Sequence, residues 1–272
     1  MIKRIYLEIT DICNLNCPFC TNEKGNSYMQ LEDIKDYLDK IKGICDYIYL
    51  HVLGEPLLHP SFNEILELLD SKDFKLQLVT NGILLSKYPD ILSHKSLRKL
   101  SISLHSINNL NIDEDYFKTI NNLIEHNNNK TIELRLYDYD NLDDRLHAYL
   151  KNLQDKYDFE ITKKNNSYKL KDNVYIYFEE LFRWPDLKDE YISDRGKCLG
   201  AISQLAILHN GDVTTCCLDP KGINKIGSLK SKTLKDILDS QEYLDIINNY
   251  QKHLFTKELC KHCSYRLRFE KQ

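Results

Sequence analysis

The segment that decides the fold is residues 4–20, RIYLEITDICNLNCPFC. Its first part, residues 4–9, alternates in character and is rich in strand-forming residues, so it predicts a β-strand. The loop that follows places three cysteines in the spacing C-x3-C-x2-C. A cubane iron–sulfur cluster takes a thiolate on each of its four irons, and a loop with three cysteines leaves one iron open. The segment therefore predicts a strand that leads directly into an open cluster site.

Zinc is the alternative metal for this loop. Structural zinc sites normally pair two local ligands with two from elsewhere and so close a tetrahedron. The loop instead offers three cysteines together, and no histidine beside them supplies a fourth ligand. This pattern favours an iron–sulfur cluster over zinc.

Strand and helix patterns alternate after the cysteine loop. The further strands are expected at residues 47–52, 75–80, 99–104, 131–136 and 159–163, and the helices at 31–41, 62–69 and 142–153. Such alternation predicts parallel βα units, and six units are too few for a complete eight-stranded barrel. We therefore predict an α/β fold: a partial (β/α)6 TIM-like barrel over residues 1–175, and a small C-terminal β-hairpin and helix extension over residues 176–272.

Two capping patterns indicate where helices begin in this scheme. Ser61 with Glu64, and Thr233 with Asp236, have the spacing of a capping box. In parallel sheets the chemistry gathers at the carboxyl ends of the strands. The cysteine loop and the turns after the second and third strands all fall at that end, so we expect them to serve one site.

Composition excludes several classes of protein. The 272 residues carry a formal net charge of -4, which gives no basic surface for nucleic acid. No apolar run is long enough to span a membrane, and the first residues lack a signal-peptide core. We expect a cytoplasmic protein without a nucleic-acid or membrane partner. In that compartment nine cysteines indicate metal binding or redox chemistry in preference to disulfides.

The cysteine loop resembles the signature of the radical S-adenosylmethionine (SAM) superfamily, including the aromatic Phe19 just before the last cysteine. The resemblance implies that Cys13, Cys17 and Cys20 hold a [4Fe–4S] cluster that binds SAM, with Phe19 among the cofactor-binding residues. It also implies the reaction: one-electron reduction of SAM releases methionine and a 5′-deoxyadenosyl radical, which abstracts a hydrogen atom from substrate. The partners implied are a small-molecule substrate and an external one-electron reductant such as flavodoxin or ferredoxin.

Two further motifs carry the same resemblance. The sequence LGEP at residues 53–56 is similar to the family's Gly-Gly-Glu-Pro motif, which implies that Gly54 and Glu55 lie against the methionine amino group of SAM. By itself this motif indicates only a turn. The sequence SISLHS at residues 101–106 is similar to the motif that contacts the ribose and carboxylate of SAM, and it identifies Ser103 as a candidate.

Asn81 and Arg135 are further candidates for binding SAM, and Arg135 for binding substrate. The alternatives are structural. Asn81 and Ser103 have the residue types of capping and turn positions, and Arg135 is suited to an ion pair at the barrel mouth.

A second set of cysteines lies in the last third of the chain. The set is Cys198, Cys216, Cys260 and Cys263. Asn210-Gly211 predicts a hairpin turn that brings Cys216 back toward Cys198. Four thiolates complete one cubane, although a four-cysteine zinc ribbon has similar spacing. Cys216 and Cys217 point to opposite faces if they lie in a strand, and the Gly-x4-Cys spacing favours Cys216.

This second set resembles the auxiliary-cluster extensions of the radical SAM superfamily, called SPASM and, in the shortened form, twitch. No cysteine follows Cys263, so the pattern matches twitch, with one auxiliary [4Fe–4S] cluster. The spacing is especially similar to that of the twitch dehydrogenase of butirosin biosynthesis, which oxidises an aminocyclitol alcohol to a ketone. A cluster with four protein ligands has no open iron, so we expect it to accept an electron.

The expected function is therefore oxidation of an alcohol-bearing small molecule such as a sugar or cyclitol. Arg183 is the candidate for hydrogen bonding to substrate hydroxyls, with an inter-domain salt bridge as its alternative. A maturase that crosslinks or epimerises a ribosomal peptide is the second hypothesis, which the twelve residues before Cys13 disfavour because they leave no room for a leader-binding domain. A metal-stabilised binding module is the non-enzymatic alternative. Cys45 belongs to neither set and is expected to be a buried apolar thiol.

Overall fold

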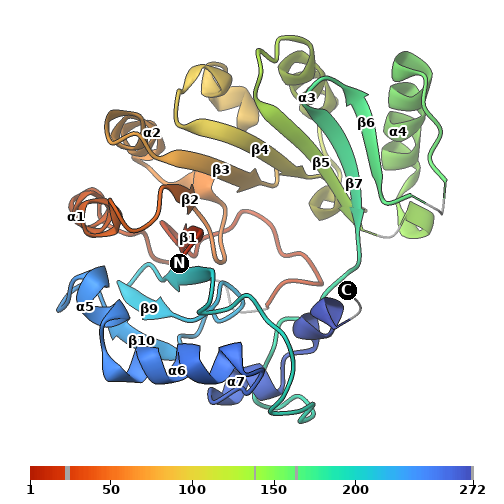
Figure 1. The fold of residues 1–272 in the computed structure, drawn as a ribbon. Coiled ribbons are helices and arrows are strands. Elements are labelled where there is room, and N and C mark those ends of the chain that lie inside the picture. The colour runs from red at the N-terminus through yellow and green to blue at the C-terminus, as the bar shows by residue number, and fades with distance from the viewer. Residues whose placement is uncertain (22–24, 138, 163–164, 271–272) are drawn as a thin grey trace. The chain divides into compact units, whose positions relative to one another are not determined.

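The computed structural model describes residues 1–21, 25–137, 139–162 and 165–270. They form two compact units (Figure 1). The first unit combines Met1–Lys75 with Phe182–Gln272, and the second is Leu76–Leu181. The predicted division into a barrel domain (residues 1–175) and an auxiliary-cluster domain (residues 176–272) is a division by function, and it stays a prediction.

The first unit contains a sheet in the order β10-β9-β8-β1-β2. Its strands are β1 (Arg4–Leu7), β2 (Tyr47–Tyr49), β8 (Gln204–Ile207), β9 (Asp212–Thr214) and β10 (Lys225–Ser228). Strand β1 lies between β2 and β8 and runs parallel to both. The C-terminal segment therefore continues the sheet that the N-terminal segment begins, and this places the loops after β1 and β8 at the same end.

The β8–β9 connection is the predicted hairpin. The two strands pair antiparallel, and Gly211 in the turn has a φ of +86°. A Cβ at Gly211 would lie 2.3 Å from the hydroxyl of Tyr37 in α1, so the turn is tightly packed as well as left-handed.

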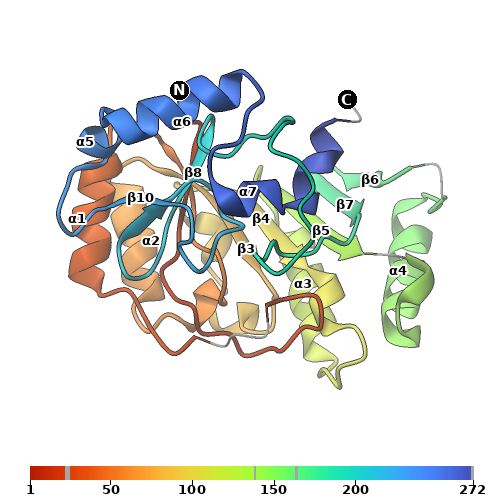
Figure 2. The same cartoon turned by 90° about the horizontal axis from the view of Figure 1, so that it is seen from below.

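Both sequence segments of the first unit contribute helices. They are α1 (Leu31–Ile41), α2 (Phe62–Ser71), α5 (Leu234–Leu238), α6 (Gln241–Gln251) and α7 (Glu258–Lys261), with 3-10 turns η1 (Pro56–Leu58) and η6 (Ser264–Phe269). Helix α1 buries one apolar stripe that includes Ile34, Leu38 and Ile41. It packs beside both α2 and α5 (Figure 2).

The second unit contains a sheet in the order β3-β4-β5-β7-β6. Its strands are β3 (Lys75–Thr80), β4 (Leu97–Ser103), β5 (Thr131–Tyr137), β6 (Ser167–Lys171) and β7 (Val174–Glu179). Its helices are α3 (Asp115–Glu125) and α4 (Asp144–Tyr157), with 3-10 turns η2 (Leu85–Lys87), η3 (Ile91–Ser93), η4 (Leu104–Ile107) and η5 (Tyr139–Asn141). Strands β3, β4, β5 and β7 are parallel, and β6 pairs antiparallel with β7.

Side chains alternate across this second sheet. Leu100, Ile102 and Leu134 are fully buried on one face. The opposite face carries polar groups, among them Ser101 and Glu133, whose hydroxyl and carboxylate are joined by a hydrogen bond of 2.7 Å. One apolar and one polar face is the pattern expected where helices cover a sheet on one side only.

The predicted fold class is confirmed: the protein is α/β, with a partial TIM-like barrel and a C-terminal extension. The position of the sixth strand was wrong. Residues 159–162 form no strand, Lys163 lies outside the described residues, and the strand parallel to β5 is β7. The chain reaches β7 through the β6–β7 hairpin, whose turn residue Asn173 has a φ of +61°. The Tyr168 hydroxyl instead bonds the backbone of Thr162, which takes up groups that a strand would need.

The two capping predictions had different outcomes. Thr233 and Asp236 form a complete capping box at the start of α5. Ser61 precedes α2 without a side-chain cap, and its backbone amide, which would donate to Glu64 in a capping box, donates to Nδ1 of His59 instead. Cys45 is buried, as predicted. Within the described residues, no helix combines the length and apolar character needed to cross a membrane.

Candidate functional site

The first cysteine set lies in the loop that follows β1. The ends of this loop are clamped, since the Asp11 carboxylate accepts a hydrogen bond of 2.7 Å from the Ser27 backbone amide. Inside it, the Cys20 amide donates to the Cys17 carbonyl at 3.0 Å, and the Leu15 amide lies 3.4 Å from the Cys13 sulfur. The loop thus holds its three thiols in a short, turned segment.

The three thiols of the first set interact electrostatically. Burial, together with the neighbouring Cys13 and Cys20, raises the pKa of Cys17 to about 11. Burial also raises the pKa of Cys20, with Cys13 adding to the effect. Thiolates this close repel each other, and a bound cation removes that repulsion. The set therefore fits a cationic metal centre better than it fits three free thiols.

The Gly54-Glu55 turn is pressed against this loop. Gly54 has a φ of +74°, and a Cβ there would lie 2.3 Å from the Thr10 carbonyl oxygen and 3.0 Å from that of Ile12. The Glu55 amide donates to the Ile12 carbonyl at 2.8 Å. Only glycine allows this close approach. The cysteine loop and the Gly54-Glu55 turn, which the sequence indicated as separate motifs, are therefore packed directly against each other.

Glu55 has a structural role in this unit. Its side chain is 2% exposed, and Oε1 accepts a hydrogen bond of 3.1 Å from the Leu57 amide, which caps η1. A carboxylate has several acceptor positions and carries a negative charge, which suits an ammonium group. Phe19 lies in the same unit, partly buried between Cys17 and Cys20 in the chain.

The other predicted SAM residues lie in the second unit. Asn81 follows β3 and is buried; its side-chain oxygen accepts from the Ile83 amide, and its carbonyl accepts from the Tyr116 hydroxyl. Ser103 ends β4, directly in register with Arg135 of β5. These environments agree with the turn role that the residue types suggested for Asn81.

Arg135 forms the ion pair that was its alternative role. Its guanidinium donates from Nε at 3.1 Å and from a terminal nitrogen at 2.5 Å to the two oxygens of Glu179. Glu179 also lines a groove of about 810 Å³ in this unit, together with Tyr139 and Phe178. Arg135 is therefore held by Glu179, a residue that lines this groove.

Arg183 lies in the first unit with a side chain that is 78% exposed. It pairs with Asp189 at 2.5 Å. Both residues belong to the same segment of the first unit, so this pair is local, and the inter-domain salt bridge that was the alternative for Arg183 is not what the structure shows.

The second cysteine set surrounds one small cavity of about 30 Å³ in the first unit. The cysteines that line it are Cys198, Cys216, Cys260 and Cys263. They come from the segment before β8, the end of the β8–β9 hairpin, α7 and the start of η6. Three pieces of chain far apart in sequence therefore bring four sulfurs to one buried place.

Cys217 is oriented differently from Cys216. It does not line this cavity, and it packs with Tyr6 against the buried cluster of Val52, Ala206 and Leu208. The two cysteines follow β9 and lie outside any strand, so the alternation expected of strand neighbours does not apply, and the side chains of Cys216 and Cys217 interact with each other. The geometry brings Cys216, and not Cys217, to the other three cysteines.

The second set has the electrostatics of a site built for a metal cluster. Burial, together with the neighbouring Cys216, raises the pKa of Cys198 to about 12 and that of Cys263 to about 11. Burial also raises the pKa of Cys260. Four thiols that resist ionisation in isolation become good ligands when a cationic centre is present to compensate them. Four sulfurs around one cavity fit a closed cluster.

Sequence reasoning missed one group at this end of the first sheet. The Glu8 carboxylate is 1% exposed and accepts hydrogen bonds from the Leu53 amide and from His209. His209 also lies 3.7 Å from Asp11. His209 lies in the β8–β9 turn with a side chain that is 26% exposed, and the pair with Glu8 holds it in place. A glutamate in the polar position before the cysteine loop is the only signal that the sequence offered.

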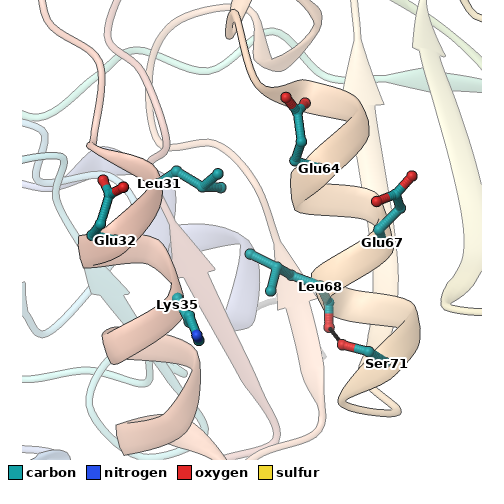
Figure 3. A pocket seen from close by; sticks show the side chains of 7 residues that line it. All are labelled: Leu31, Glu32, Lys35, Glu64, Glu67, Leu68 and Ser71. Carbon is teal, nitrogen blue, oxygen red and sulfur yellow. Dashed lines mark hydrogen bonds between the residues drawn. The ribbon is translucent and has the colours of Figure 1, made fainter.

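A groove between α1 and α2 is of a different kind. It has a volume of about 500 Å³ and carries Glu32, Glu64 and Glu67 with Lys35 (Figure 3). None of its lining residues is a cysteine or one of the predicted site residues. We assign it no part in the site.

Two family models match the chain. The model of the radical SAM superfamily matches residues 7–151, and the SPASM model, an iron-sulfur cluster-binding domain, matches residues 198–264. The first match contains the cysteine loop and the Gly54-Glu55 turn, and the second contains all four cysteines of the buried cavity. The matches thus coincide with the two sulfur sets that the structure brings together.

Individual proteins give a more distant likeness. The GTP 3′,8-cyclase of Alkaliphilus oremlandii is 30% identical over 116 residues, which cover 39% of this chain and 36% of that protein. The chain therefore matches little more than a third of that relative's length.

Two solved structures share the fold. BtrN in complex with AdoMet and 2-DOIA matches with a TM-score of 0.57 at 16% identity, covering 97% of this chain and 93% of BtrN. Native anSMEcpe with bound AdoMet and Cp18Cys peptide matches with a TM-score of 0.61 at 14% identity, covering 97% of this chain and 87% of anSMEcpe. Identities this low show a common fold.

Proposed function

The chain belongs to the radical SAM superfamily, and from this premise we propose that it is an oxidoreductase of an alcohol-bearing small molecule, such as a sugar or cyclitol. It is a radical SAM enzyme with a SPASM domain, and its cofactors are SAM, a SAM-binding [4Fe–4S] cluster and an auxiliary [4Fe–4S] cluster. What the proposal adds is the direction of the chemistry and the class of substrate.

The observation that carries the proposal is the closed set of four cysteines around one buried cavity. A cluster with four protein ligands has no iron free for substrate. Its use is then to exchange electrons. An acceptor inside the protein allows a substrate radical to lose one more electron, so the net reaction is an oxidation.

The assignment of residues follows from the two sets. Cys13, Cys17 and Cys20 would hold the SAM-binding cluster, and Cys198, Cys216, Cys260 and Cys263 the auxiliary cluster. These groups, with an electron from an external donor such as flavodoxin or ferredoxin, would supply a radical able to take a hydrogen atom from the alcohol carbon and an acceptor for the second electron. The hydroxyl proton would leave to solvent, so the net change would be from alcohol to ketone.

The protein's own contribution is binding and orientation. Gly54 gives the close backbone approach, and Glu55 offers a buried carboxylate to the ammonium of SAM. Phe19 lies in the cysteine loop and would cover the cluster. Asn81, Ser103 and Arg135 are proposed to contact SAM through polar side chains, and Arg183, which is exposed, to hydrogen-bond substrate hydroxyls.

Stoichiometry tests this function. Anaerobically purified protein should contain about eight irons and eight sulfides per chain. With a polyol or aminocyclitol panel as substrate, we expect one 5′-deoxyadenosine per product molecule, and a product lighter by two hydrogens. A product isomeric with its substrate, or zinc in the C-terminal site, would refute the oxidoreductase assignment.

Peptide maturation is the second candidate, because the fold match to the peptide complex of anSMEcpe is as extensive as that to BtrN. The spacing of the second cysteine set, which is similar to that of the butirosin dehydrogenase, favours the small molecule. A parallel panel of cysteine- and serine-containing peptides decides between the two. Substrate-dependent formation of 5′-deoxyadenosine with peptides alone would move the assignment to a maturase.

A further inference from the structure

One sulfur of the second set receives two side-chain hydrogen bonds. The Tyr250 hydroxyl lies 3.1 Å from the Cys260 sulfur, and the Asn224 side-chain amide lies 3.3 Å from the same atom. The neighbouring sulfurs of Cys198 and Cys216 accept hydrogen bonds from backbone amides, and Cys216 also has one side-chain donor. The Gly200 backbone amide serves Cys198 at 3.3 Å, and the Leu218 backbone amide serves Cys216 at 3.4 Å, with the Gln204 side chain at 3.5 Å.

Both side-chain donors are held in place. Tyr250 is 2% exposed and packs edge-on against Phe255, with ring centres 5.1 Å apart. Asn224 is also 2% exposed, and its backbone amide donates to the buried Asp219 carboxylate at 2.7 Å. Burying a phenol and an amide costs free energy unless each finds a partner. Here both find the same sulfur.

We propose that Tyr250 and Asn224 raise the reduction potential of the auxiliary cluster by donating hydrogen bonds to the Cys260 sulfur, and that this makes the cluster able to accept an electron from the substrate radical. The inference rests on the proposed function, because it requires Cys260 to be a cluster ligand. Both residues act through the Cys260 sulfur, so they are positioning residues.

The physical basis is the charge of the reduced state. Adding an electron makes the cluster and its thiolates more negative, and donors that point at a ligand sulfur stabilise that state. Burial acts in the opposite direction, since a site of low dielectric penalises added charge. A buried acceptor therefore needs such donors more than an exposed one.

The positive charge of Arg266 should also raise the reduction potential of the auxiliary cluster. Arg266 lines the cavity and is 1% exposed. Its guanidinium donates to the backbone carbonyls of Ser193 and Arg195 and stacks over Phe255 at 4.7 Å. Because Arg266 also holds that backbone together, it is not a clean site for a test. Tyr250 and Asn224 are cleaner.

The test is a redox titration of anaerobically reconstituted, full-length holoenzyme, followed by electron paramagnetic resonance and with iron quantified. Tyr250→Phe should lower the midpoint potential of the auxiliary cluster. We expect about a tenfold shift in its reduction equilibrium, which is about 59 mV for a one-electron couple. Asn224→Ala should shift it in the same direction, and the double variant further than either.

Tyr243→Phe is the matched control. Tyr243 lies on the same helix, α6, and its buried hydroxyl donates to the Ala201 carbonyl at 2.8 Å instead of to sulfur. The control should lose a buried hydrogen bond and keep the wild-type potential. Equal potentials in Tyr250→Phe, Tyr243→Phe and wild type, with full iron content, would overturn the inference.

Two other results have defined meanings. Loss of the auxiliary irons from both Tyr250→Phe and Asn224→Ala would assign the two donors a purely structural role and would also overturn the inference. If only one variant loses iron, the other carries the test. If wild-type protein shows zinc or a single redox transition, the proposed function itself fails, and this is distinguishable from unchanged potentials in a protein that holds both clusters.

Discussion

Nδ1 of His209 lies 2.9 Å from Oε2 of Glu8, and the His209 backbone amide donates to the same oxygen at 3.2 Å. The other carboxylate oxygen accepts from the Leu53 amide at 3.0 Å, next to Gly54. Glu8 follows β1, His209 follows β8, and Leu53 follows β2. One buried carboxylate therefore joins the loops after three neighbouring strands, and it anchors the chain that leads into both cysteine sets.

Glu8→Gln should lower the melting temperature more at pH 6 than at pH 8.5. The hydrogen bond that His209 donates to the Glu8 carboxylate raises the pKa of His209, whereas burial lowers it; Asp11 adds to the rise and Lys230 opposes it. A histidine whose folded pKa is raised contributes stability that is complete below its unfolded pKa of about 6.5 and is lost as the pH rises through the folded pKa. At pH 6 we expect a loss of about 2 kcal/mol, typical for a hydrogen bond to a charged group.

Anaerobic calorimetry at the two pH values measures this difference. Glu64→Gln serves as control, because it removes an exposed carboxylate of the α1–α2 groove (Figure 3). An equal loss for Glu8→Gln at both pH values would show that the pair does not depend on a charged His209.

Gly54→Ala should abolish SAM binding. The added Cβ would lie 2.3 Å from the Thr10 carbonyl oxygen, which is backbone and has to move, and the cysteine loop moves with it. Gly43→Ala is the matched control: Gly43 has a φ of +84°, but nothing lies within 4 Å of its Cβ position. It should lose about 1 kcal/mol of stability through backbone strain alone and still bind SAM. Equilibrium dialysis compares the two, and similar affinities would contradict the close-contact argument.

Cys216→Ala should reduce the iron content from about eight to about four per chain, whereas Cys217→Ala should leave it near eight. The reason is that Cys216 lines the buried cavity and Cys217 does not. Iron and sulfide analysis after anaerobic reconstitution measures the difference, with Cys45→Ala as a cysteine that belongs to neither set. The reverse pattern would exchange the assignments of the two adjacent cysteines.

His105 should make the protein less stable as the pH falls below about 6.5. Burial lowers the pKa of His105 to about 3, and the nearby Arg135 adds to this effect. The unfolded chain takes up a proton near pH 6.5, but the folded protein does not until about pH 3, so stability falls across that window. His105→Gln keeps a donor for the Arg135 carbonyl and does not titrate. Urea midpoints at pH 5 and pH 7.5 should therefore differ less in this variant than in wild type; an unchanged difference would remove His105 as the cause.

Much of the fold could be predicted from local pattern. Strands β1 to β5 and helix α1 follow from hydrophobic periodicity, since each buries one regular face. The sixth parallel strand could not be placed, because residues 159–162 and 174–179 both alternate, and only pairing with β5 selects the second. The cap at Ser61 failed for a similar reason: His59, two residues earlier, already occupies its backbone amide.

The sequence by itself determined the chemistry: C-x3-C-x2-C after a strand, LGEP, and four later cysteines identify the groups that bind, because spacing along a loop and residue type are local properties. Only the tertiary structure decided which parts lie together. It brought Cys198, Cys216, Cys260 and Cys263 to one cavity, left Cys217 outside its lining, placed Tyr250 and Asn224 beside a single sulfur, and paired Glu8 with His209. These contacts join residues far apart in the chain, and packing between elements, which no local pattern encodes, sets their distances.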